Sequence, residues 1–316
     1  MKQYLQLLKN SMARRLFLAA TPARMAYSMI GLAIFFKTER TLDSIPLAGL
    51  ALGLNGLAGS LTAGLRGNVI DKYGQKWPIR IMVPTYSALL IALNSADSKF
   101  SMLALAFILG FSAPPINLSV RPLWKVVVPE SFLRTAYAID SAIMNFAGVI
   151  GPVIATTLAL STRPESALYI CAALMMTGGI ALAFTKVSRD WIPEKKDKDH
   201  QPIWRHRPLQ LLMIEGCFIG FGWGLFDVAV PAFTTLEKVP HMTAWIFGAM
   251  GVANVVGGLL AGLVSKKTSS LKAMRRTYFI WFLVSIPMVF TYPNWSMVRS
   301  EEHTSELQSH HDLVCR

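Results

Sequence analysis

The feature that most constrains this chain is the repetition of long apolar runs. A helix needs about 20 consecutive apolar residues to cross the roughly 30 Å hydrocarbon layer of a bilayer. Such runs lie near residues 16–36, 44–65, 78–96, 100–122, 134–160, 165–186, 208–235, 242–264 and 276–297. Hydrophobic residues make up 53% of the chain and charged residues only 16%. We therefore predict an all-α polytopic membrane protein with nine membrane-spanning helices.

The basic residues gather in alternate connections between these runs. A net charge of +13 would by itself suit a nucleic-acid-binding protein. However, few cations lie in the connections opposite to the side of the N-terminus, namely Lys37, Arg40, Lys99, Arg163 and Lys238. The positive-inside rule explains this distribution if the N-terminus is cytoplasmic. We expect a lipid bilayer as the surroundings and no nucleic-acid partner.

The sequence lacks the motifs of metalloenzymes and ATPases. It contains no CxxC pair, no HExxH helix and no phosphate loop of the form GxxxxGK[ST]. Cys171 and Cys217 fall inside predicted spans, where cysteine behaves as a small apolar residue. We therefore expect no enzymatic activity, no metal site and no bound cofactor.

A charged stretch after the sixth run divides the chain. Residues 187–207 contain two prolines and show no sustained apolar period, which predicts a cytoplasmic linker. The sequence GSLTAGL at 59–65 resembles GGLLAGL at 257–263, and each lies in the second run of its part. Duplication explains the similarity, and chance recurrence of small packing residues is the alternative. We predict a six-helix half at 1–186 and an incomplete, three-helix half at 208–298.

Residues 299–316 differ in character from the rest. The sequence RSEEHTSELQSHHDLVCR has no apolar helical stripe, and its first eleven residues are similar to a translated sequencing-library adapter. We expect a non-native tail on a truncated gene product, with an ordinary polar tail as the alternative. We assign no metal site to the histidines of this segment, which are His303, His310 and His311.

The connection after the second run carries the most specific motif. Its sequence, GLRGNVIDKYGQKWPIR, fits the pattern GxxxD[RK]xG followed by basic residues, through Gly67, Asp71, Lys72, Gly74 and Lys76. This pattern, in this connection, resembles the signature loop of the major facilitator superfamily of secondary transporters. The resemblance implies twelve helices in two halves, of which nine are present here, and transport by alternating access.

In that family the loop acts as a latch between the two halves. By position, the resemblance assigns this latch role to Asp71, which sits at the inner end of the second predicted helix. For Lys72, Lys76 and Arg80, enforcing the membrane topology is an equal alternative. Gln75 stands where the family usually has arginine or lysine.

Ionisable residues inside the predicted spans point to function, since burying a charge near a helix centre costs about 2.5–3.5 kcal/mol or more. Arg24 and Glu215 lie at similar depths in the first and seventh spans, which line the central cavity in the family. We expect the two side chains to face each other, and snorkelling to the headgroups is the alternative. Asp227 and Glu215 are the candidates for proton binding.

The fifth predicted span supplies the remaining candidates. Asp140 either pairs with Arg121 as a structural tie or contacts the substrate, and Asn145 lies beyond it in the same span. Gly148, Gly151 and Pro152 partly match the GxxxGP motif found in this helix of drug/proton antiporters, and they suggest a kink or a packing notch.

The segments RPLW at 121–124 and TAYAIDS at 135–141 resemble a bacterial subgroup of the superfamily that contains many efflux carriers. We therefore predict a proton-coupled efflux antiporter for a small solute, acting as a monomer in the bacterial cytoplasmic membrane and driven by the proton gradient without a cofactor. An uptake symporter of the same fold and an inactive fragment are the alternatives.

Overall fold

The computed structural model describes residues 6–193 except residue 8, residues 207–262 and six positions between 275 and 283. It divides into two units, Met1–Val256 and Gly257–Arg316. The second unit is described only at residues 257–262 and at those six positions. Most of the predicted ninth span and the whole tail therefore lie outside the described residues, and the predicted division at the linker stays a prediction.

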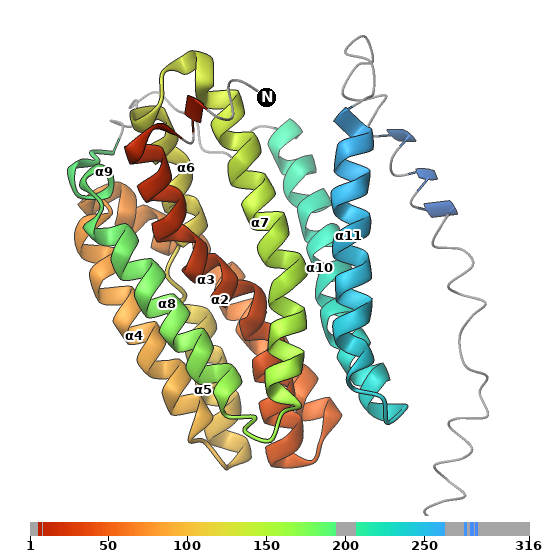
Figure 1. Cartoon of the computed structure of the whole chain (residues 1–316). Coiled ribbons are helices and arrows are strands. Elements are labelled where there is room, and N and C mark those ends of the chain that lie inside the picture. The colour runs from red at the N-terminus through yellow and green to blue at the C-terminus, as the bar shows by residue number, and fades with distance from the viewer. Residues whose placement is uncertain are drawn as a thin grey trace, which may run out of the picture. The chain divides into compact units, whose positions relative to one another are not determined.

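The described residues form helices and no strand, which confirms the predicted all-α class (Figure 1). The helices are α2 (Ser11–Leu42), α3 (Ile45–Tyr73), α4 (Lys76–Asn94), α5 (Lys99–Ser112), α6 (Ile116–Val127), α7 (Glu130–Ala159), α8 (Ser166–Phe184), α9 (Lys186–Asp190), α10 (Arg207–Leu236) and α11 (Met242–Gly262).

Six described stretches are long and apolar enough to cross a membrane. They are Ser11–Leu42, Ile45–Tyr73, Lys99–Val127, Glu130–Ala159, Ser166–Phe184 and Gln210–Leu236. The 19-residue α4 coincides with the third predicted span but contains Lys76 and Arg80, which lower its hydropathy. The apolar part of α11, Met242–Ala253, is shorter. The chain is thus a multi-pass membrane protein.

Helix α2 lies at the centre of the first unit and packs most extensively against α8, then α7 and α3. Its buried face is rich in alanine, including Ala13, Ala20, Ala23 and Ala26. Small side chains let helix backbones approach closely, which is the main source of packing energy between helices in lipid. Helix α4 lies along α8 on the other side (Figure 1).

The fourth predicted span is interrupted between α5 and α6. Pro114 and Pro115 lie at the break, and proline has no N–H to donate and disfavours helix at the residue before it. The carbonyl groups freed by the break find donors on other helices, as a bilayer requires. The Arg66 guanidinium of α3 donates to the Ala113 carbonyl, and the Tyr27 hydroxyl of α2 donates to the Pro114 carbonyl.

The connection between α3 and α4 is shorter than the sequence suggested. Helix α3 continues to Tyr73, eight residues beyond the end of the apolar run predicted at 44–65, so Gly67, Asp71 and Lys72 belong to its last turns. Gly74 alone of the motif glycines has a positive φ, +73°. A side chain there would be strained and would meet the Trp191 carbonyl 3.5 Å away, so this turn requires glycine.

Candidate transport cavity

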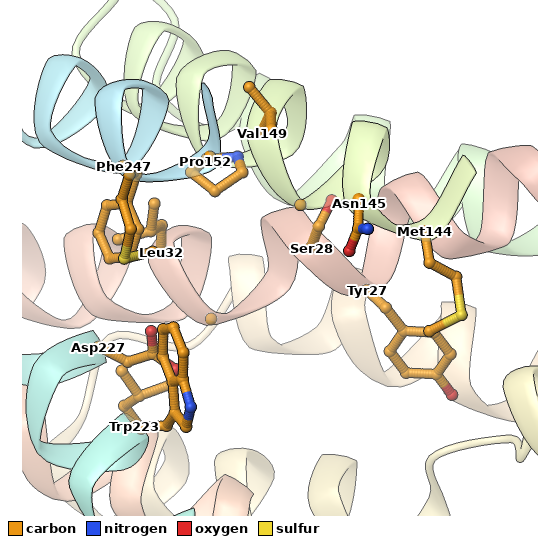
Figure 2. Close-up of a pocket in the computed structure, with 15 residues that line it drawn as sticks. Tyr27, Ser28, Leu32, Met144, Asn145, Val149, Pro152, Trp223, Asp227 and Phe247 are labelled. Carbon is orange, nitrogen blue, oxygen red and sulfur yellow. The ribbon is translucent and has the colours of Figure 1, made fainter. Parts of the chain in front are cut away.

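A cavity of about 350 Å³ lies inside the first unit, among α2, α3, α7, α10 and α11 (Figure 2). Its described lining consists of Tyr27, Ser28, Gly31 and Leu32 of α2, Leu52 of α3, Met144, Asn145, Gly148, Val149 and Pro152 of α7, Trp223 and Asp227 of α10, and Phe247, Met250 and Gly251 of α11. The lining therefore combines helices that precede the charged stretch at 187–207 with helices that follow it.

A glycine brings α7 against α2 beside the cavity. A Cβ atom at Gly151 would overlap the Ser28 side chain, so the two helices approach this closely only because the residue is glycine. Gly148, one turn earlier, faces open space and lines the cavity, as does Pro152. The predicted packing notch thus corresponds to a contact at Gly151 and an opening at Gly148.

Few polar groups face this cavity. The Tyr27 hydroxyl already donates to the Pro114 carbonyl, and the Ser28 hydroxyl donates to the Met25 carbonyl of its own helix at 2.8 Å. Asp227 and Asn145 both have exposed side chains in the lining. Among the described residues, no ion pair involves Asp227. A carboxylate within a membrane-spanning helix thus opens onto the cavity.

Aromatic side chains from α10 and α11 form part of the same cavity wall. Trp223 lies one helical turn before Asp227, and Figure 2 shows the two side chains next to each other. The Trp223 and Phe226 rings meet edge to face with centroids 6.1 Å apart, and Phe226 contacts Phe247 of α11 in the same way at 5.7 Å. These contacts fix the aromatic wall that α10 and α11 present to the cavity.

A second polar cluster, away from the cavity lining, joins α2, α6 and α7. Arg24 Nη1 lies 2.8 Å from Asp140 Oδ1, and both side chains are almost fully buried, with 2% and 3% exposed. Arg24 Nε donates to Asn117 Oδ1 at 3.1 Å, and Trp124 Nε1 donates to Asp140 Oδ1 at 3.1 Å. The Phe17 ring packs on Trp124 with centroids 4.5 Å apart. The Asp140 carboxylate thus offsets the charge of the buried Arg24 guanidinium, whose Nη2 alone has no hydrogen-bond partner among the described residues.

This cluster corrects two predicted pairings. Arg24 pairs with Asp140 and not with Glu215, because α2 turns this arginine toward α7. Glu215 is half-buried in α10 and is not among the described residues that line the cavity. Arg121 is exposed, because α6 buries Leu123 and Trp124 and leaves Arg121 on its other face. Asp140 therefore forms a structural tie, but with Arg24.

Comparison with known proteins decides the family. The sequence model of the Major Facilitator Superfamily matches residues 16–299. The chain belongs to the major facilitator superfamily. The chain is also similar, at 26% identity over 264 residues, to a protein named "Uncharacterized MFS-type transporter y4rN" from Sinorhizobium fredii (strain NBRC 101917 / NGR234). That alignment covers 78% of the chain and 65% of the relative, so the chain spans slightly less than two-thirds of the relative's length. The family is one of secondary transporters and points away from an enzyme.

The signature segment is tied to the rest of the first unit through Gln75. This side chain is fully buried, donates to the Ser119 carbonyl at 2.9 Å and accepts from the Ser188 hydroxyl at 3.1 Å. A neutral amide thus joins α4, α6 and α9 where the sequence shows a departure from the family motif. Asp71 is exposed on α3, and its latch role stays a prediction.

The structure places two of the predicted cavity residues, Asp227 and Asn145, at the cavity. It adds the aromatic partners Trp223 and Phe247, which the sequence analysis missed. The spacing of Trp223 and Asp227, four residues apart, would have placed them on one helix face. Nothing in the sequence links Phe247 to them, because it comes from a different helix.

Proposed function

We propose that this chain belongs to a carrier that exports a small solute across the bacterial cytoplasmic membrane by alternating access, in exchange for protons. The observation that supports the proposal is the cavity itself, which combines α2, α3 and α7 with α10 and α11 around one carboxylate. Secondary transporters bind substrate between the two halves of their fold, and rocking of one half against the other exposes that site to each side in turn. In this proposal the N-terminus is cytoplasmic and the protein acts as a monomer.

Asp227 is the proposed proton-binding group. An ionisable residue within a membrane-spanning segment is costly, and such residues mark substrate and proton pathways in transporters. Tyr27, on α2, is the other titratable residue of the described lining; the described lining residues of α3, α7 and α11 carry no charge. Protonation neutralises Asp227 and removes the electrostatic cost of closing the cavity around it.

Alternating access can be tested without knowing the solute. The three cysteines are replaced by alanine, Asn145→Cys is introduced into the cavity, and a charged, membrane-impermeant thiol reagent is applied to right-side-out and to inside-out vesicles. We expect labelling in both orientations, because a single cavity opens to each side in turn. Labelling from one side only, or from neither, would contradict the proposal. Leu61→Cys is the control: Leu61 is 71% exposed on α3 and does not line the cavity, so lipid should protect it.

The direction of transport has its own test. In inside-out vesicles made acid inside, a proton-coupled exporter accumulates solute in the lumen as protons leave. An uptake symporter of the same fold would deplete the lumen of solute under the same gradient. Loss of the gradient on adding a protonophore should abolish the accumulation, and accumulation that persists without the gradient would refute proton coupling.

A further inference from the structure

We propose that the cavity selects a compact organic monocation with an apolar or aromatic body. This inference rests on the proposed function, because it names the class of solute carried by the same cavity. It follows from the charge, the hydrogen-bonding capacity, the wall chemistry and the size of the described lining.

Charge excludes anions and favours cations. The described lining contains one carboxylate, Asp227, and no lysine, arginine or histidine. A bound anion would face a like charge in a medium of low dielectric constant, with no basic side chain to offset it. A bound monocation instead supplies the counter-charge that Asp227 does not receive from any described residue.

Hydrogen-bonding capacity excludes strongly polar solutes. Tyr27 and Ser28 use their hydroxyl hydrogens on backbone carbonyls, so Asn145, Asp227 and the indole N–H of Trp223 are the remaining polar side-chain groups of the described lining. A sugar would bring several hydroxyl groups that need partners once they leave water. A zwitterionic amino acid would leave its carboxylate without a cation. Both classes fit the uptake-symporter alternative, and neither fits the lining that the described residues provide.

The walls suit a cation with an apolar body. Trp223 stands beside Asp227, Phe247 lies across from them on α11, and Met144 and Met250 contribute flexible thioethers (Figure 2). Aromatic faces attract cations, and this attraction is strongest for tryptophan and for desolvated cations such as quaternary ammonium groups. A volume of about 350 Å³ is near the lower end of small-molecule sites, which favours a compact solute.

The proposal also explains exchange. A proton and an organic cation compete for the same carboxylate, so the carrier binds one or the other and not both. Cation binding is therefore strongest at high pH, where Asp227 is ionised, and weakens as the pH falls and the carboxyl group takes up a proton. Tyr27 is the other titratable residue of the described lining. An ordinary tyrosine hydroxyl loses its proton only near about pH 10, well above the pH at which carboxyl groups take up a proton.

The test is equilibrium binding of radiolabelled phenyltrimethylammonium to the purified full chain in detergent. Its neutral carbon isostere, tert-butylbenzene, and the anion benzenesulfonate serve as unlabelled competitors. We expect the unlabelled cation to compete at least about tenfold better than either. We expect Asp227→Asn to weaken binding by about tenfold or more, Asp227→Glu to retain most of it, and Trp223→Leu to weaken it by about threefold or more.

The matched control is Asp97→Asn, the same substitution at a carboxylate that is 86% exposed and lies outside the cavity lining; its binding should equal that of the unaltered chain. Equal competition by the neutral isostere, undiminished binding by Asp227→Asn, or no binding to the unaltered chain would each overturn the proposal. The Asp227→Glu variant separates loss of charge from loss of folding.

The two proposals fail in different ways. If Asn145→Cys is labelled from both sides while the cation binds no better than its neutral isostere, alternating access stands and the solute class is wrong. If the cation binds through Asp227 but labelling occurs from one side only, the cavity is a cation site without the proposed transport cycle.

Discussion

Removing the charge of Asp140 should destabilise the helix bundle strongly. Asp140→Asn keeps the size of the side chain and an oxygen that accepts from Trp124 Nε1, but it leaves the buried Arg24 guanidinium without its counter-ion. Two unit charges about 4 Å apart attract by about 4 kcal/mol at an effective dielectric constant of 20. Removing one partner of a buried pair costs about 3–5 kcal/mol, because the remaining charge stays buried. We expect a loss of stability of this size.

The measurement is the temperature at which half of the detergent-purified protein leaves the monodisperse peak in size-exclusion chromatography. A loss of about 3 kcal/mol should lower this temperature by about 6 °C or more. Asp97→Asn is the control, because the Lys37–Asp97 pair is separated by 3.9 Å with Asp97 86% exposed, and such pairs contribute at most about 1 kcal/mol. If Asp140→Asn proves as stable as Asp97→Asn, the buried pair does not compensate Arg24 as described.

Two further substitutions test contacts near the proposed site. Gly151→Ala should lower the free energy of unfolding by about 1–3 kcal/mol, because the added methyl group overlaps Ser28 of α2. Gly148→Ala is the control: its methyl group faces open space and should leave the thermal midpoint unchanged or raise it. Equal midpoints for the two variants would show that α7 can shift without cost. Gln75→Ala should free α9 from α4 and α6 and speed trypsin cleavage after Arg189, which is exposed on α9, by severalfold. Cleavage at the rate of the unaltered chain would mean that Gln75 does not hold α9.

The positions of the helices along the chain could be predicted from the sequence, and their partners could not. Apolar length determines which segments span a bilayer, and eight of the predicted spans correspond to described helices or to the α5–α6 pair. Apolar length does not predict which side of α2 faces α7. Lipid and neighbouring helices are both apolar, so hydrophobicity does not tell which face is buried against protein. Arg24 was for this reason paired with Glu215 and not with Asp140.

The break between α5 and α6 has a local sequence signal, but the continuous apolar pattern outweighs it. The run at 100–122 stays apolar through Pro114 and Pro115, so one span is predicted there, and the break that these prolines cause is missed. The carbonyl partners of the break, Arg66 and Tyr27, come from other helices and have no local signal. At the cavity, Asp227 and Asn145 could be chosen because polar groups within spans are rare. The aromatic wall depends on how α10 and α11 pack, which the sequence does not specify.

The central claim is that a solute cation and a proton exclude each other at Asp227, and proton release on binding tests it most directly. Phenyltrimethylammonium is added to weakly buffered protein in detergent, at the pH that halves its binding, and the released protons are followed with a pH indicator. We predict release that rises with cation occupancy and disappears in Asp227→Asn. Cation binding to the unaltered chain without proton release, or equal release from Asp227→Asn, would contradict the account.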